Sequence, residues 1–212
     1  MKKIRIRIGV ILTTFVCVII SLFLNITPTV ASNVEYSTAD NLYYTGLNID
    51  SDGNPTAYSI AGESTSFVFM NGMVDKTATS VTIYPTYNDK PVISIGEFAF
   101  SHAALTSVTF AKRADTDTWQ LTTIGNDAFS SDIFTSIALP SSVTTIGGGA
   151  FRESSLTTIK IIDGTNNDLS SSNITSIGSY AFHKSKISSF IFPTGLTYVS
   201  NNMFSDCTNL SS

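Results

Sequence analysis

The sequence predicts a mostly β solenoid, a fold in which short repeated units stack along one axis. A seven-residue motif, S/T-I-G-x-x-A-F, occurs four times and once more in degenerate form, always ending on a phenylalanine. The spacings between these phenylalanines are 29, 22, 31 and 22 residues. Charged residues make up only 13% of the chain, and serine and threonine are abundant, as suits an exposed β surface. The phenylalanines are Phe100, Phe129, Phe151, Phe182 and Phe204.

The first 31 residues have the features of a secretory signal peptide. Four basic residues precede an apolar run from Ile8 to Leu24, and Thr29 and Ala31 supply the small residues of a cleavage site. The alternative is an uncleaved membrane anchor, since the run approaches the length that spans a bilayer. We expect residues 1–31 to be cut after Ala31, so that the mature chain is secreted or displayed on the cell surface.

Removal of this segment leaves eight basic and 16 acidic residues, a net charge of −8. An acidic chain is a poor match for nucleic acid, and it contacts a membrane only through the signal segment if that segment is not cleaved. The mature part keeps one cysteine, Cys207, so a disulfide within the chain is excluded. Stability is therefore expected to come from a buried repeat core.

Residues 32–80 lack the repeat and are expected to form a small β cap, because a solenoid must cover its open end. The stretch "NLYYTGLNIDSDGNPTAYSIAG" has the pattern of two strands around a turn. Asn48, Asp50, Asp52 and Gly53 resemble part of a calcium loop, but its twelfth position would hold Ser59 instead of glutamate. A plain turn is favoured.

Each repeat has two short strand segments with a turn between them. In the third copy, "VTTIGGGAFRESSLTTIKI", alternation directs Ile159 and Ile161 to the core and Thr158 and Lys160 outward. Stacking of such units is expected to build a ladder of phenylalanines. The inward positions of the other copies are Leu105, Val108, Phe110, Phe134, Ile137, Leu139, Ile187, Phe190 and Phe192. The motif glycines, which need positive φ or a tight corner, are Gly96, Gly125, Gly147 and Gly178.

The segments "FTSIALPSSVTTIGGGAF" and "ISSFIFPTGLTYVSNNMF" resemble the BspA-like class of leucine-rich repeats. The resemblance implies a leucine-rich-repeat solenoid over residues 81–212, with short turns or helical turns between strands and about five copies, the last incomplete. Members commonly carry a cysteine three residues after the motif phenylalanine, and here only the last copy does, at Cys207. The other copies hold Ala103, Asp132, Ser154 and Ser185.

The resemblance implies a secreted or cell-surface repeat protein that mediates protein–protein or cell–matrix attachment. Its partner would be a host matrix protein, a cell-surface protein or a glycan. The alternative is a non-catalytic repeat appendage of a larger surface hydrolase, whose catalytic domain would lie beyond residue 212.

The sequence has few residues or motifs suited to catalysis, and we expect no enzyme, no cofactor and no metal site. The "GGGAF" stretch lacks the lysine and hydroxyl residue that follow a phosphate-binding loop. His102 and His183 are the only histidines and are expected to be exposed turn residues. Outward strand positions carry no pair of carboxylates for glycoside hydrolysis. Hydroxyl rows such as Thr122, Thr144 and Thr175 could order water, although ordinary β propensity is favoured.

Two insertions give the best candidate for a binding site. Relative to a 22-residue step, residues 111–120 and 162–173 lengthen the first and third repeats. Insertions at one point of a solenoid repeat emerge along one edge, often the binding edge. The first holds the only tryptophan, a residue type enriched at hot spots, or else one that folds back to anchor its own loop. The candidate residues are Lys112, Arg113, Asp115, Asp117, Trp119, Asp163, Asn166, Asn167 and Asp168.

The signal peptide gives a first testable prediction. Amino-terminal sequencing of the exported protein should begin at Ser32. A chain that still begins at Met1 in the membrane fraction would show that the segment is an anchor instead.

Overall fold

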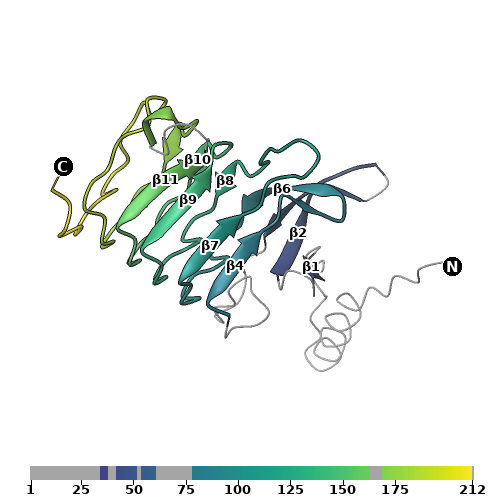
Figure 1. Ribbon diagram of the computed structural model, residues 1–212, viewed down its shortest axis with the longest axis horizontal. Helices are drawn as coiled ribbons and strands as arrows, with labels where there is room; N and C mark the ends of the chain where they lie inside the picture. Colours follow the sequence, from purple (N-terminus) through teal and green to yellow (C-terminus); the bar gives the residue numbers. More distant parts are fainter. Residues whose placement is uncertain (1–33, 38–41, 52–53, 61–77, 163–168, 212) are drawn as a thin grey trace, which may run out of the picture.

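The computed structural model describes residues 34–37, 42–51, 54–60, 78–162 and 169–211, which form an elongated stack of coils (Figure 1). In this part of the chain the regular structure is β, apart from the helical turn η1 (Leu169–Ser171), and no helix there could cross a membrane. The strands are β1 (Val34–Ser37), β2 (Leu42–Ile49), β3 (Pro55–Ile60), β4 (Ser80–Ile83), β5 (Thr86–Tyr87), β6 (Lys90–Ile95), β7 (Ser107–Phe110), β8 (Thr123–Ile124), β9 (Ser136–Pro140), β10 (Thr145–Ile146), β11 (Thr158–Ile162) and β12 (Ser176–Ile177).

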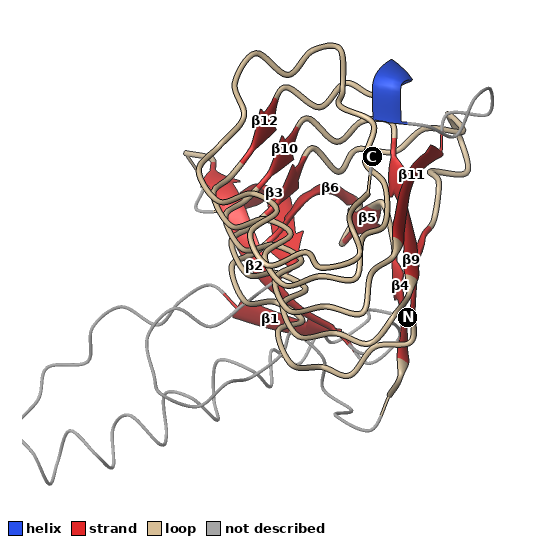
Figure 2. Cartoon of the chain, turned by 90° about the vertical axis from the view of Figure 1, so that its left-hand side faces the viewer, coloured by secondary structure: helices blue, strands red, loops and turns tan. Residues whose placement is uncertain are grey.

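Successive coils place their strands in two columns. The first is a sheet of order β1-β2-β3-β6-β8-β10-β12, with β5 paired to β6, and its strands from β3 onward are parallel. The second column holds the parallel pairs β4–β7 and β9–β11, with β7 and β9 as neighbours (Figure 1). Figure 2, turned to look along the stack, shows the coils superposed on one another. The predicted leucine-rich-repeat solenoid is confirmed.

A β-hairpin connects to the first repeat. The strands β2 and β3 are antiparallel, and their turn is closed by hydrogen bonds from Asp50 N to Asn54 O (2.9 Å) and from Asn54 N to the Asp50 carboxylate (2.8 Å). The carboxylate thus caps its own turn, as the plain-turn interpretation requires, although Asp52 and Gly53 lie outside the described residues. The parallel pairing of β3 with β6 continues the sheet into the repeats.

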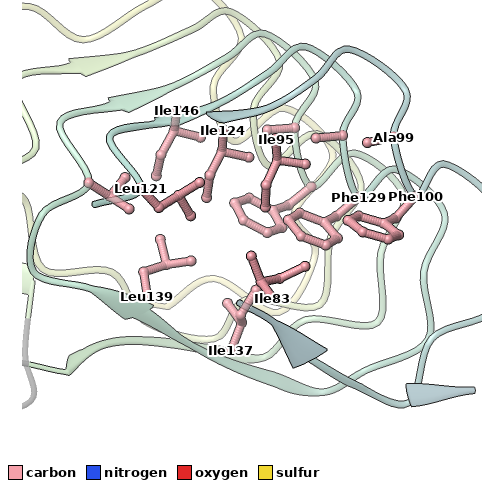
Figure 3. Close-up of a cluster of buried hydrophobic side chains, with 14 of the residues drawn as sticks. Ile83, Ile95, Ala99, Phe100, Leu121, Ile124, Phe129, Ile137, Leu139 and Ile146 are labelled. Carbon is pink, nitrogen blue, oxygen red and sulfur yellow. The ribbon is translucent and has the colours of Figure 1, made fainter. Parts of the chain in front are cut away.

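The predicted phenylalanine ladder is confirmed. From Phe100 to Phe204, consecutive rings are stacked with centroids 5.3, 5.6, 5.6 and 5.3 Å apart and ring planes within 11° of parallel. The first four are fully buried, and Phe204 is half-buried at the end of the stack. Figure 3 shows Phe100 and Phe129 facing the isoleucines of the first column, such as Ile95 and Ile124. The ladder therefore fills the centre of every coil.

The turns that carry the phenylalanines are joined by a regular set of backbone hydrogen bonds. The phenylalanine and the residues two before and two after it each donate an N–H to a carbonyl of the next repeat, at 2.8–3.2 Å. In the third turn the donors are Gly149, Phe151 and Glu153. The intervening N–H groups, such as that of Arg152, donate within their own turn. Each of these four steps is thus held by three turn bonds, and the first three steps have strand pairs as well.

The motif glycines lie at a tight corner, where the backbone of the preceding coil is very close, and their φ angles are not positive. A Cβ on Gly125 would lie 2.7 Å from the backbone carbon of Gly96, and one on Gly147 would lie 2.6 Å from Asn126 N. Left-handed φ angles of 48–62° occur instead two residues before and two residues after each phenylalanine. The residues there are Phe98, His102, Asp127, Ser131, Gly149, Glu153, Tyr180, Lys184, Asn202 and Asp206.

The threonine rows are engaged in bonds between repeats. The hydroxyl of Thr122 donates to Ile93 O (3.1 Å), that of Thr144 to Thr122 O (3.2 Å), and that of Thr175 to Thr144 O (3.5 Å). These hydroxyls cap carbonyls of the preceding coil. Their regularity is therefore explained by the fold, without a water-ordering surface.

The last repeat leaves apolar positions uncovered. Phe192 contacts the rings of Phe190 and Phe204, as an inward residue should, yet it is 47% exposed. Its counterparts Leu139 and Ile161 are fully buried because another repeat covers them. Val199 is similarly 54% exposed. Described residues 178–211 contain no assigned strand, so the strand expected around Phe190 does not form at this end.

One buried carboxyl stands out in the core. Asp132, three residues after the motif phenylalanine Phe129, is 1% exposed, and burial raises the pKa of its carboxyl to about 8. Its Oδ1 accepts a hydrogen bond from Leu105 N (3.0 Å) in the preceding repeat, whereas no described residue bonds to Oδ2. The corresponding Ser154 and Ser185 are small, neutral and also buried. Burial therefore favours the protonated, uncharged form of the Asp132 carboxyl at neutral pH.

The ladder predicts a difference between central and terminal phenylalanines. Phe151→Ala should lower the free energy of unfolding by about 3–5 kcal/mol, because the cavity opens between two neighbouring repeats. Phe204→Ala should cost clearly less, since the terminal ring contacts one neighbour of the ladder and is already half-exposed. Denaturant melts of both variants measure this, and equal losses would contradict a repeat stack.

Asp132 predicts a stability that depends on pH. Folding raises the pKa of its carboxyl. The free energy that this carboxyl contributes to the stability of the fold is therefore fully present below about pH 4 and is lost as the pH rises through about 8. Asp132→Asn, which cannot ionise, should therefore gain stability over the parent chain across this window, by up to about 1.4 kcal/mol per pH unit. Parallel urea melts from pH 4 to 9 test this, and a constant difference would show that the carboxyl is not buried uncharged.

Candidate functional site

The first insertion is an ordered loop at the end of β7. Residues Arg113 and Thr118 form an antiparallel bridge, with a hydrogen bond from Arg113 N to Thr118 O of 2.8 Å. Asp117 N donates to Arg113 O at 2.8 Å, and Asp117 adopts a left-handed φ of 51° to close the turn. At its root, Ala111 N bonds to Ile83 O in the preceding coil (2.9 Å). The loop is therefore a small hairpin tied to the solenoid.

The charged residues of this loop are paired with one another on the surface. Lys112 Nζ lies 2.9 Å from the Asp117 carboxylate, and Arg113 Nε lies 2.6 Å from that of Asp115. The hydrogen bond from Arg113 lowers the pKa of the Asp115 carboxyl. Exposed pairs of this kind add little stability. Their significance is that they place two cations and two anions close together on an accessible surface.

Trp119 anchors this loop. Its Nε1 donates to Phe110 O (3.3 Å), and its half-buried ring packs against the hydrophobic core. The ammonium of Lys112 lies over the indole ring of Trp119, 4.7 Å from the ring centroid. Of the two interpretations of this tryptophan, the local anchor fits these contacts. A partner would therefore meet the charged rim first and the indole only in part.

The second insertion follows β11 and is described only at its two ends. Asp163, Asn166, Asn167 and Asp168 lie outside the described residues. Beyond them, Leu169 is buried in the turn η1. The Asn173 side chain then donates from Nδ2 to Ser141 O (2.8 Å), in the turn after β9, and so joins the third repeat to the second. The sequence does not reveal this tie, because asparagine is common in any loop.

The two insertions leave the stack on the same edge. Both follow strands of the second column, β7 and β11, and β9 lies between them. The expectation that they emerge along one edge is therefore met at their roots. The floor between these roots is the turn after β9, where Asn173 already contacts Ser141.

The two histidines differ in their surroundings. His102 is exposed, as expected, but the prediction was wrong for His183, whose side chain is only 16% exposed. The stacked turns place its Nδ1 2.6 Å from Ser205 Oγ and its ring edge-to-face with Tyr180. Among the described residues, no group of three histidine, cysteine or acidic side chains could hold a metal ion.

The stacked coils and edge insertions define a solenoid repeat protein. A model of the BspA-type leucine-rich repeat region matches residues 77–211 with six copies, and the chain belongs to this family. The five motif phenylalanines indicate five copies. The structure explains a sixth, since β4 pairs in register with β7, Val81 beside Val108, and so occupies the place of a repeat strand.

Solved structures share this fold. The pneumococcal vaccine antigen PcpA is 17% identical, with a TM-score of 0.57 over 84% of this chain and 48% of its own. The T. pallidum leucine-rich repeat protein TpLRR is 18% identical, with a TM-score of 0.51 over 83% of this chain and 80% of its own. This chain thus spans about half the length of PcpA. No protein with a curated description matches it.

Proposed function

We propose that this chain is a secreted or surface-displayed binding module that attaches to a host matrix or cell-surface protein through the edge formed by its insertions. Membership of the BspA-type repeat family supports a binding role, and the signal-peptide pattern of the amino-terminal sequence supports export. The solved relatives share the fold, and PcpA is described as a vaccine antigen.

The observation that carries the proposal is the ordered charged loop of residues 111–120. A repeat stack needs no insertion to be stable, and yet this one is held by a backbone bridge, two ion pairs and a tryptophan anchor. Loops held rigidly on a scaffold lose little conformational entropy when they bind. By contrast, the outward face of the second column offers small polar side chains, with Lys160 as its charged residue in β11.

The proposal predicts that binding depends on the rim of the loop. The double variant Arg113→Ala/Asp115→Ala leaves the Trp119 anchor intact and should weaken binding about tenfold or more. Shortening residues 111–120 to the length of the connection after β9 should abolish it. Biolayer interferometry against collagen, laminin and fibronectin measures both effects.

Lys160→Ala provides the matched control, because it removes an exposed charge from the sheet face and leaves the insertion edge unchanged. Full binding by both loop variants, with loss in Lys160→Ala, would assign recognition to the sheet instead. Circular dichroism melts establish that each variant remains folded.

A further inference from the structure

Two exposed tyrosines lie in the last two repeats. Tyr198 is 64% exposed and Tyr180 is 44% exposed. They are linked through neighbouring residues, since Tyr180 N donates to Asn201 O (3.2 Å) and the Tyr198 hydroxyl lies 3.5 Å from Asn201 Oδ1. The two rings and the two asparagines at 201 and 202 form one surface, which we call the tyrosine platform.

The fold does not require an aromatic residue at position 198. Thr123, Thr145 and Ser176 occupy the place of Tyr198 in earlier repeats, on the outer side of the first column. Tyr180 stands at the left-handed position that every repeat has, where the side chain varies from Phe98 to Gly149. Packing does not account for the large ring of Tyr198, which is 64% exposed where the other repeats have small residues.

The platform is also held in place. Asn202 Nδ2 donates to the Tyr180 hydroxyl at 2.8 Å, and the Tyr180 ring meets His183 edge-to-face with centroids 5.5 Å apart. His183 is itself fixed by Ser205, at 2.6 Å. The Tyr180 ring is therefore oriented before any ligand arrives, and the ordering cost of binding is reduced.

The amide groups retain capacity for a ligand. Within the described residues, Asn201 Nδ2 and Asn202 Oδ1 make no hydrogen bond, while the other atom of each amide faces a tyrosine hydroxyl. The exposed residues thus offer one free donor and one free acceptor beside two aromatic faces. Neither the tyrosines nor the asparagines carry a charge.

We propose that the tyrosine platform is a binding site for a neutral glycan. The C–H faces of a pyranose ring stack on exposed tyrosines, and adjacent sugar hydroxyls both accept from and donate to an amide pair. A protein partner fits less well, because two tyrosines bury at most about 500 Å², whereas a specific protein interface buries more than about 1,000 Å². This site shares no residue with the insertions and does not depend on the proposed protein attachment.

Affinity gel electrophoresis of the folded chain tests the site, with laminarin, mannan, galactomannan or heparin cast in the gel. We expect retardation by at least one of the three neutral polysaccharides and none specific to heparin. Tyr198→Ala should weaken the apparent affinity about tenfold or more. Tyr180→Gly should do the same without lowering the melting temperature, because glycine adopts the left-handed conformation without strain.

Tyr84→Ala is the matched control, since Tyr84 is 45% exposed near the other end of the stack. It should bind like the parent chain. Absence of retardation in every neutral gel, or equal retardation of the parent and both platform variants, would overturn the proposal. Retardation by heparin alone would also overturn it, because that result would indicate an anion site.

Discussion

The bonding of the turn backbone is the constraint on which the rest of the structure depends. Around each motif phenylalanine, alternate N–H groups donate to the next repeat, and those between them close the turn itself. This alternation needs left-handed residues on both sides of the phenylalanine. It sets the distance between coils, and that distance in turn allows the phenylalanine rings to stack face to face. It also leaves no room for a Cβ at Gly125, Gly147 or Gly178, which lie against the coil before them.

Much of this fold could be predicted from the sequence, because the repeat multiplies a weak signal. One phenylalanine in a glycine-rich stretch says little, whereas five at related spacings identify a stacked column. The left-handed positions could not be predicted, since residues as different as Phe98, Asp127 and Asn202 occupy one of them. Propensity gives no signal there, and the bonds to the neighbouring coil impose the conformation. The sequence indicates an incomplete last repeat, but it does not indicate the exposure of Phe192, which has an inward sequence position and is covered by no further repeat among the described residues.

The candidate site was predicted only in part. Loop length placed both insertions on one edge, because strand order in a solenoid follows chain order. The role of Trp119 depended on which surface its ring meets, and the sequence leaves that undecided. The contacts with Phe110 and Lys112 make it an anchor. Tyr198 could have been noticed as a large residue at a position that holds serine or threonine in the other repeats. The link of Tyr198 to Tyr180 through Asn201 and Asn202 becomes visible only when the last two coils are stacked.

The direction of the turn bonds has a mechanical consequence. They join one coil to the next, so they lie roughly along the axis of the stack, which is also its long axis (Figure 1). A tensile force between the two ends pulls along these bonds, and because the coils are joined in series, the interface held by the fewest bonds yields first. The chain would then yield coil by coil from its less covered end, near Phe204. Such a molecule, tethered at one end and attached at the other, would lengthen under flow in small steps and would recover its length when the load is released.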